Sequence, residues 1–169
     1  MVLARYQSKR LTDWIEGTLE GRFRLTINRE KTRIVPMRQP GASLTFLGFT
    51  LRYDHDRYGR DRTFLNVFPS AKAQARAREK LRELTGHHRC SAPIPEVIDE
   101  VNRWLMGWGN YFRHGHPGRV FASMNWYVQS RLRHHLKRRS QRHLRIPEGE
   151  SFYALLHRLG VRRLRATRG

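Results

Sequence analysis

The chain has 169 residues, of which 34 are Lys or Arg and 14 are Asp or Glu, so its net charge is +20 at pH 7. Charge of this size opposes compaction unless a polyanion neutralises it, and this makes a nucleic acid the expected partner. An anionic membrane surface is the alternative, but the basic residues are spread along the chain instead of clustering beside an apolar segment. A hydrophobic content of 38% is enough for a modest core and argues against a disordered basic tail.

Cysteine usage and hydropathy indicate the compartment. The single cysteine, Cys90, cannot form an internal disulfide, which fits a reducing environment. No apolar stretch approaches the roughly 20 residues that a membrane span needs, and Met1 opens no signal peptide. A cytoplasmic protein without a membrane partner is therefore expected.

Residues 8–20 are predicted to form an amphipathic helix, because apolar side chains recur there at helical spacing and Gly21 supplies a stop. Apolar and polar residues then alternate over 23–27, which predicts a half-buried strand. A second extended segment is expected over 32–37, before the turn signal Pro40-Gly41.

Residues 44–53 and 63–68 are rich in aromatic and β-favouring residues, and a charged segment separates them. This arrangement predicts a long-looped β-hairpin. The aspartates Asp54, Asp56 and Asp61 of the charged segment are expected to pair with Arg57, Arg60 and Arg62 and not to bind Mg²⁺. The period becomes helical after Pro69, so a domain boundary is placed there.

Four helices are expected after that boundary. The first begins after the N-cap Ser70, the second starts at Ile94, and the third repeats apolar residues every three or four positions over 121–136. A short fourth helix is predicted over 151–159, and the basic residues 161–169 are expected to be mobile. The predicted core positions of the bundle are Val97, Val101, Leu105, Trp108, Val128 and Leu132.

Three short motifs follow one another along the chain. Residues 28–32 read Asn-Arg-Glu-Lys-Thr, residues 46–49 read Phe-Leu-Gly-Phe, and residues 107–113 read Gly-Trp-Gly-Asn-Tyr-Phe-Arg. In this order and at this approximate spacing, they resemble signatures of the C-terminal half of a group II intron reverse transcriptase/maturase. The resemblance covers nearly the whole chain.

The resemblance implies a particular α+β architecture. Residues 1–68 would be the C-terminal part of the reverse-transcriptase palm with a primer-grip-like β-hairpin. Residues 69–145 would be the maturase-specific thumb or X domain, a three-helix bundle, and residues 146–169 a basic C-terminal segment with a short helix. Members of the family carry a Tyr-Ala-Asp-Asp turn that holds catalytic Mg²⁺, followed by a strand similar to residues 2–6. The chain is therefore expected to be a fragment that starts just after this turn.

The implied function is that of an RNA-binding maturase fragment from a mobile element. The thumb would bind group II intron RNA and template-primer, including an RNA/DNA duplex, and would assist RNA splicing. The chain alone is expected to be no enzyme and to need no cofactor, since Mg²⁺ belongs to the complete polymerase. Two alternatives stay open: a split reverse-transcriptase subunit complemented by a separate fingers-palm chain, and a non-functional remnant of a mobile element.

Two candidate sites lie in the palm part. In the family that the chain resembles, the position of Lys31 contacts the incoming nucleotide, so Lys31 would do so only if another chain completes the site. Otherwise Lys31 is a solvated lysine at the end of a strand. Phe46, Leu47, Gly48 and Phe49 resemble the primer grip, whose glycine lets the backbone approach the primer closely. Packing of Phe46 and Phe49 in the hairpin core is compatible with this role.

The thumb part supplies the other expected nucleic-acid contacts. Trp108 is expected to fill the core with Tyr111 and Phe112, whereas Asn110 and Arg113 fall off the apolar stripe and suit contacts with ribose or phosphate. The basic residues of the third helix have few carboxylates nearby, so phosphate binding is favoured over a merely solvated face. The remaining nucleic-acid-binding candidates are Arg131, Arg133, Lys137, Arg138, Arg139, Arg142, Lys72 and Arg76.

Nine histidines suggest a metal site as a further alternative. However, neither His87 and His88 near Cys90 nor the pair His114 and His116 completes a four-ligand zinc set. The companion cysteine pairs of a zinc finger or an H-N-H endonuclease module are also absent from the sequence. No metal site is predicted.

Overall fold

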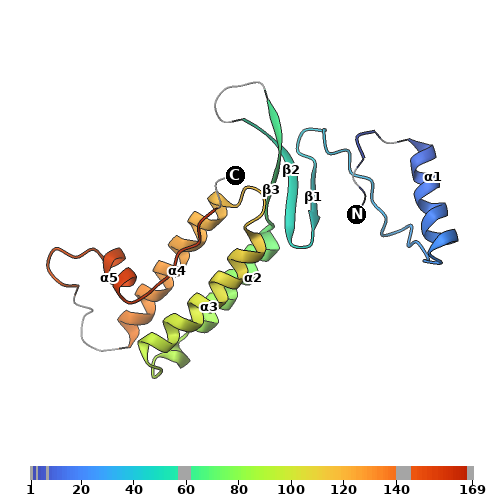
Figure 1. The fold of residues 1–169 in the computed structure, drawn as a ribbon. Helices are drawn as coiled ribbons and strands as arrows, with labels where there is room; N and C mark the ends of the chain where they lie inside the picture. The colour runs from blue at the N-terminus through green and yellow to red at the C-terminus, as the bar shows by residue number, and fades with distance from the viewer. Residues whose placement is uncertain (1, 3, 7, 57–61, 140–145, 167–169) are drawn as a thin grey trace. The chain divides into compact units, whose positions relative to one another are not determined.

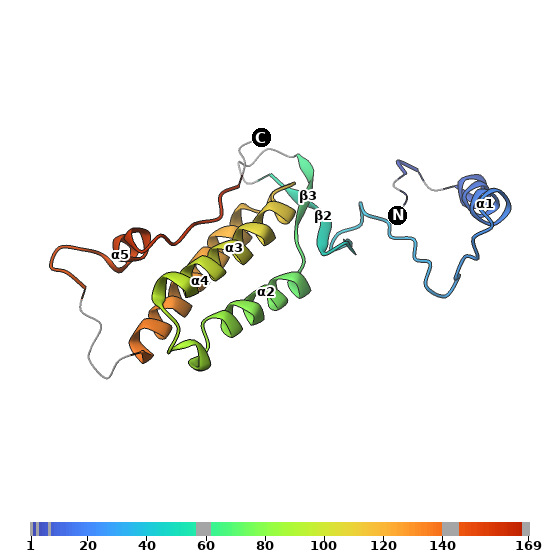
Figure 2. The ribbon, with the colours of Figure 1, turned by 60° about the horizontal axis from the view of Figure 1, so that its bottom comes forward.

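The computed structural model describes residues 2, 4–6, 8–56, 62–139 and 146–166. Over these residues it contains five α-helices and one three-stranded antiparallel sheet, which confirms the predicted α+β class. The chain divides into two compact units, Met1–Pro36 and Met37–Gly169, and each is described by itself. Figures 1 and 2 show the elements in two views.

The first unit contains helix α1 (Lys9–Gly17), which continues into a turn of π-helix (Thr18–Arg22). The Ser8 hydroxyl accepts a hydrogen bond from the Leu11 N–H at 3.2 Å and so caps the helix. The predicted helix over residues 8–20 is confirmed in substance. However, no residue of α1 is buried, so this helix lacks the tertiary packing that supplies most helical stability in proteins.

The extended segments predicted in this unit do not form strands. Residues 23–27 and 32–37 have no strand structure, and Phe23, Leu25 and Ile34 are each more than half exposed. A strand needs a partner for its backbone N–H and C=O groups, and alternation of side chains alone cannot supply one. The strand prediction for residues 23–27 is therefore wrong, and the segment 32–37 has no strand partner.

The sheet begins the second unit and has the strand order β1-β2-β3. Strands β1 (Ser43–Phe46) and β2 (Phe49–His55) are joined by the two-residue turn Leu47-Gly48, and β3 (Thr63–Pro69) pairs with the other edge of β2. The pairing of β2 with β3 confirms the predicted hairpin. A single strand over 44–53 was expected, and this is wrong: both turn residues have positive φ (48° and 81°), and this I′-type turn divides the segment in two.

Three long helices follow the sheet: α2 (Ala71–Leu84), α3 (Ile94–Phe112) and α4 (Gly118–Arg138). Ser70 caps α2 as predicted, because its hydroxyl accepts a hydrogen bond from the Ala73 N–H at 3.2 Å. The three helices lie side by side in both views (Figures 1 and 2). The predicted helices are thus confirmed in number, order and position.

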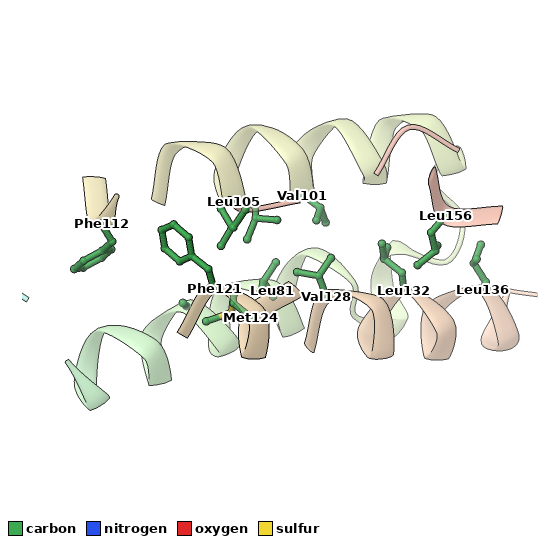
Figure 3. Packing of buried hydrophobic residues seen from close by; sticks show 12 residues of the cluster. Leu81, Val101, Leu105, Phe112, Phe121, Met124, Val128, Leu132, Leu136 and Leu156 are labelled. Atoms are coloured by element: carbon green, nitrogen blue, oxygen red, sulfur yellow. The ribbon is translucent and has the colours of Figure 1, made fainter. Parts of the chain in front are cut away.

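The core of the second unit lies where these helices meet. Figure 3 shows Val101 and Leu105 of α3 facing a row of apolar side chains from α4. All predicted core positions are buried except Tyr111, which is 52% exposed, and Trp108, which is only partly buried. The Trp108 ring packs at the margin of the core, 4.8 Å from the Phe112 ring and 5.9 Å from the Phe121 ring between centroids. The buried apolar residues that α4 contributes are Phe121, Met124, Val128, Leu132 and Leu136.

The chain returns to the bundle after α4. Helix α5 (Phe152–Arg158) confirms the predicted fourth helix and places Leu155 and Leu156 in the interior. Residues 160–166, here called the strap, then run along the bundle (Figures 1 and 2). Leu164 is only 5% exposed. The expectation of a mobile C-terminal end is therefore wrong for residues 161–166, because an apolar residue anchors them.

Two buried asparagines hold the backbone of the strap. Asn102 of α3 donates to the Gly160 carbonyl and accepts from the Arg162 N–H, both at 2.8 Å. Asn125 of α4 donates to the Leu164 carbonyl at 3.0 Å and accepts from the Leu164 N–H at 2.9 Å. An amide side chain offers both a donor and an acceptor, so each asparagine replaces the neighbour that a strand would otherwise need. The strap is therefore an integral part of the bundle.

Candidate nucleic-acid interface

Two of the sequence motifs meet at one end of the bundle. The Tyr111 hydroxyl donates to the Leu47 carbonyl at 2.9 Å. The Phe49 ring stacks on Tyr111 and packs against Phe112, with centroid distances of 5.6 Å and 4.8 Å. The β1–β2 turn is thus fixed to the end of α3, and residues 46–49 and 107–113 form one structure.

Gly48 is the point of close approach in this structure. Its φ is +81°, and a Cβ at this position would lie 3.2 Å from Phe112 Cζ. Beside it, Leu47 is 66% exposed and Phe46 is 39% exposed. Packing of Phe46 in the hairpin core was expected and is not observed. Phe49 is the packing residue, whereas Phe46 and Leu47 present apolar surface outward.

The end of α3 also carries the predicted polar contacts. Asn110 and Arg113 are both exposed. The loop that follows is held to β3, because the His116 N–H donates to the Val67 carbonyl at 2.7 Å. An open hollow at this end of the bundle is lined by Phe49, Val67, Asn110, Tyr111 and His114.

Three arginines predicted to bind phosphate make contacts within the protein. Arg131 Nε donates to Thr85 Oγ1 at 3.1 Å, and Arg138 Nη2 donates to the Thr85 carbonyl at 2.9 Å. Arg139 donates to the Ala92 carbonyl. Thr85 is the C-cap of α2, so Arg138 supplies a donor to a helix-end carbonyl, whereas Arg131 meets a hydroxyl and Arg139 meets a carbonyl just before α3. They join the end of α4 to the connection between α2 and α3.

That connection contains a short 3-10 turn, His87–Arg89. Arg89 donates to Glu100 of α3 at 2.7 Å. The Thr85 hydroxyl also donates to the Leu81 carbonyl at 2.6 Å. The connection is therefore fixed from α2, α3 and α4.

The other predicted phosphate ligands differ in their surroundings. Arg133 lies 4.8 Å from the centroid of the Phe152 ring, a cation–π contact that joins α4 to α5. Lys72, Arg76 and Lys137 are exposed. Arg142 lies outside the described residues. The exposed cations are those that solvent-borne phosphate can reach without a change in packing.

His135 lies on α4 between the arginines that contact the α2–α3 connection, and it is 1% exposed. Burial lowers the pKa of its imidazole, because the charged form loses its hydration. The positive charges of Arg139, Arg138 and Arg131 lower this pKa further, and an interaction with the Thr85 backbone opposes the shift. His135 is therefore a neutral core residue near neutral pH.

Lys31 belongs to the first compact unit. Its backbone N–H donates to the Asn28 carbonyl at 3.2 Å and to Asn28 Oδ1 at 3.0 Å, and the residue is exposed. These contacts define a turn. A position at the end of a strand was expected for Lys31. This is wrong, because no strand forms on either side of it.

Three residues for which the sequence motifs predict no role are prominent in the structure. Asn102 and Asn125 lie among the apolar positions of their helices. A polar residue at such a position indicates a buried hydrogen-bonding role. Trp126 is 69% exposed on α4. Its position between the buried residues Met124 and Val128, off the apolar stripe, predicts that exposure.

Across the described ranges, no group of three or more His, Cys, Asp or Glu side chains is arranged to hold a metal ion. Asp54 lies in β2, where a hydrogen bond from Asn66 and, to a smaller extent, the Arg52 guanidinium at 2.8 Å hold its pKa below the ordinary value. Arg52 was not among the partners expected for it. In the part of the chain that the structure covers, no helix is both long and apolar enough to cross a membrane.

The fold is thus a basic α+β protein built on a three-helix bundle. Residues 74–147 match the family model for the group II intron, maturase-specific domain. The chain therefore carries this domain, and its recognition as part of a group II intron maturase is confirmed. The match begins within α2 and includes all of α3 and α4, and it concerns the maturase-specific domain and not the polymerase region. A comparison with curated proteins found no match.

Proposed function

We propose that this chain binds group II intron RNA through the α2–α4 bundle and assists the splicing of that RNA in the cytoplasm. The observation that carries the proposal is the maturase-specific match, which falls on this bundle. The net charge of +20 supports it, since RNA is the polyanion that would neutralise such a charge.

The proposed phosphate contacts are the exposed cations of α2 and α4. Lys72, Arg76 and Lys137 are exposed, so they can bind phosphate without giving up a contact in the core. Arg131 and Arg138 each donate a hydrogen bond to an oxygen of Thr85. A guanidinium has five N–H donors, so these two arginines stabilise the fold and still keep further donors for RNA.

We further propose that the β1–β2 turn and the end of α3 contact template-primer. Leu47 is exposed, and its carbonyl is oriented by Tyr111, so the turn presents a fixed backbone surface. Asn110 lines the adjacent hollow and can hydrogen-bond a ribose hydroxyl. An RNA/DNA duplex is the second expected ligand of this end.

Salt-dependent binding tests the first proposal. Replacing Lys72, Arg76 and Lys137 together by Gln should reduce the slope of log affinity against log salt by roughly 2–3, because each lost phosphate contact removes a little under one unit. The matched control replaces three exposed cations of the first unit, Lys9, Arg10 and Arg24, by Gln and should change the slope less. An unaltered slope in the folded bundle variant would contradict the assignment of these contacts.

The splicing part of the proposal needs a separate measurement. The chain should accelerate splicing of a group II intron RNA at moderate salt and should bind that RNA more tightly than generic duplex RNA. The variants Arg131→Gln and Arg138→Gln test the structural role of these arginines. They should lower the free energy of unfolding, because Thr85 loses the hydrogen bonds that these residues donate. A chain that binds intron RNA and generic duplex equally, without effect on splicing, would argue against a maturase function.

A second candidate is a split reverse transcriptase in which a fingers-palm chain completes this one. The observation that favours it is the first unit, where no residue of α1 is buried and Trp14 is 66% exposed. A further chain would cover this apolar surface, and Lys31 could then contact a nucleotide. Co-purification with such a chain would support this candidate. So would primer extension by the mixture of the two chains but by neither chain alone. A non-functional remnant is opposed if the isolated chain unfolds in one cooperative transition.

A further inference from the structure

Trp126 has an exposure that packing does not explain. It is 69% exposed on α4, whereas Trp104 and Trp108 of the same unit are partly buried against the core. A tryptophan side chain is the largest apolar group that a protein can bury, so leaving it in water forfeits a substantial stabilisation. An exposed tryptophan on a rigid helix is therefore a candidate binding residue.

Cationic residues lie two or three turns away from Trp126 on the same face of α4. Residues seven or eleven positions apart on an α-helix point within about 20° of each other, because one turn takes 3.6 residues. This rule aligns Trp126 with Arg119, Arg133 and Lys137, all of which are exposed. From Arg119 to Lys137 the row is about 27 Å long at 1.5 Å per residue. Helix α4 contains no Asp or Glu of its own, although Arg119 at one end of the row interacts electrostatically with Asp54 of β2.

Aromatic and basic groups also border the row on both sides. On the side of Gln129, the Arg163 guanidinium lies 4.9 Å from the Tyr153 ring centroid and donates to the Tyr153 hydroxyl at 2.7 Å. On the side of Ser123, Arg78 of α2 donates to the Ser123 hydroxyl at 3.4 Å. The lining of a small hollow beside the row includes Gln129 of α4, Tyr153 of α5 and Arg163 of the strap.

We propose that Trp126 is a stacking platform for an unpaired RNA base, and that Arg119, Arg133 and Lys137 hold the phosphates of the same strand. This inference rests on the proposed RNA-binding function and specifies a site and a strand type. Stacking on an aromatic ring suits a single strand, since the bases of a duplex already stack on one another. A membrane surface fits less well, because the row has one aromatic residue among polar neighbours and no continuous apolar face.

The experiment compares Trp126→Ala with the unaltered full chain in binding a short oligouridylate and an RNA duplex of similar charge. Oligouridylate affinity should fall about 5- to 150-fold, the factor that corresponds to loss of one base–aromatic stack, while duplex affinity stays within about twofold. The salt dependence should not change, because tryptophan carries no charge. Trp126→Phe should retain most of the affinity.

Trp14→Ala is the matched control, because Trp14 is 66% exposed on α1 and lies outside the proposed site. It should leave oligouridylate binding unaltered. Far-UV circular dichroism and the thermal midpoint of each variant establish that the bundle is folded.

Several outcomes would overturn the inference. Unaltered oligouridylate binding by Trp126→Ala in a chain that still binds intron RNA would refute the stacking site and leave the proposed function standing. Absence of salt-dependent RNA binding by the unaltered chain would refute both. A loss of affinity that Trp126→Phe does not restore would also count against an RNA base as the occupant. The same holds if Trp126→Ala weakens binding to anionic phospholipid vesicles but not to RNA.

Discussion

At the scale of single residues, Gly107 and Gly109 show how two glycines of one motif differ. Both lie within α3, where glycine is less favourable than alanine by roughly 0.5–1 kcal/mol. A Cβ at Gly107 would meet nothing within 4 Å, whereas a Cβ at Gly109 would lie 2.2 Å from Leu164 Cδ2. A larger residue at 109 would therefore displace the Leu164 side chain of the strap, whereas position 107 has room for one.

We predict that Gly109→Ala lowers the free energy of unfolding by about 1–3 kcal/mol, because Leu164 must leave its position. Gly107→Ala is the matched control and should stabilise the protein slightly through helix propensity. Urea denaturation measures both. In a double-mutant cycle, Gly109→Ala should cost less when Leu164 is already Ala, and strictly additive costs would mean that the two residues do not compete for space.

His135 gives a second prediction at this scale. Its folded-state pKa lies below the unfolded value of about 6.5, so the unfolded state binds more protons as the pH falls. The stability due to neutral His135 should be complete above about pH 6.5 and should be lost as the pH falls through the folded-state pKa. Denaturant unfolding at about pH 8 and about pH 5 should show a smaller acid loss for His135→Phe than for the unaltered chain.

The control for this prediction is His134→Gln, which replaces the exposed neighbouring histidine. It should keep the acid sensitivity of the unaltered chain. If His135→Phe loses as much stability in acid as the unaltered chain does, the titration lies in other groups.

At the scale of elements, the strap behaves as a strand that pairs with side chains. Asn102 and Asn125 are each 7% exposed, and their amides take the place of a neighbouring backbone. The strap lies beyond residue 147, where the family match ends, yet it completes the core of the matched bundle through Leu164. The bundle and its C-terminal extension are therefore one folding unit.

We predict that Asn125→Ala lowers the free energy of unfolding by about 2–3 kcal/mol, because the buried Leu164 N–H and carbonyl lose their partners. Asn110→Ala, on the exposed face of α3, should change it by less than about 0.5 kcal/mol. In a chain that ends at residue 159 the effect of Asn125→Ala should be smaller, since the strap is gone. A full effect in that shortened chain would mean that Asn125 acts elsewhere.

Helix α4 divides its basic residues between two tasks. Arg131, Arg138 and Arg139 donate to backbone or hydroxyl groups of the α2–α3 connection, although Arg138 is also exposed. Arg119 and Lys137 are exposed on the outer face of the helix. Charge counting along the helix treats all five alike. The phosphate-binding prediction is therefore concentrated on the outer residues.

At the scale of the whole molecule, we predict that this chain alone does not extend a primer. Phosphoryl transfer of this kind needs Mg²⁺ held by carboxylates, and the sequence contains no Tyr-Ala-Asp-Asp segment. Primer extension with Mg²⁺ and a template should give no product above a protein-free blank. Product formed by material free of other polymerases would overturn the prediction, and a mixture with a fingers-palm chain is the positive comparison.

The amino-acid sequence by itself determined the charge, the four helices after Pro69, the Ser70 cap and the family. These features depend on local periodicity, capping and short motifs, which a single sequence displays directly. The strand prediction failed over residues 23–27, because a strand exists only through its partner. The sequence also predicted most of the bundle core, but it placed Trp108 too deeply.

Only the tertiary structure decided which side chains are available to a ligand. In it, Tyr111 donates to Leu47, Arg131 and Arg138 donate to Thr85, and Leu164 of the strap packs against Gly109. Each of these contacts connects residues more than forty positions apart. Helical period and charge describe one element at a time, so they cannot show which arginine meets a carbonyl of another element.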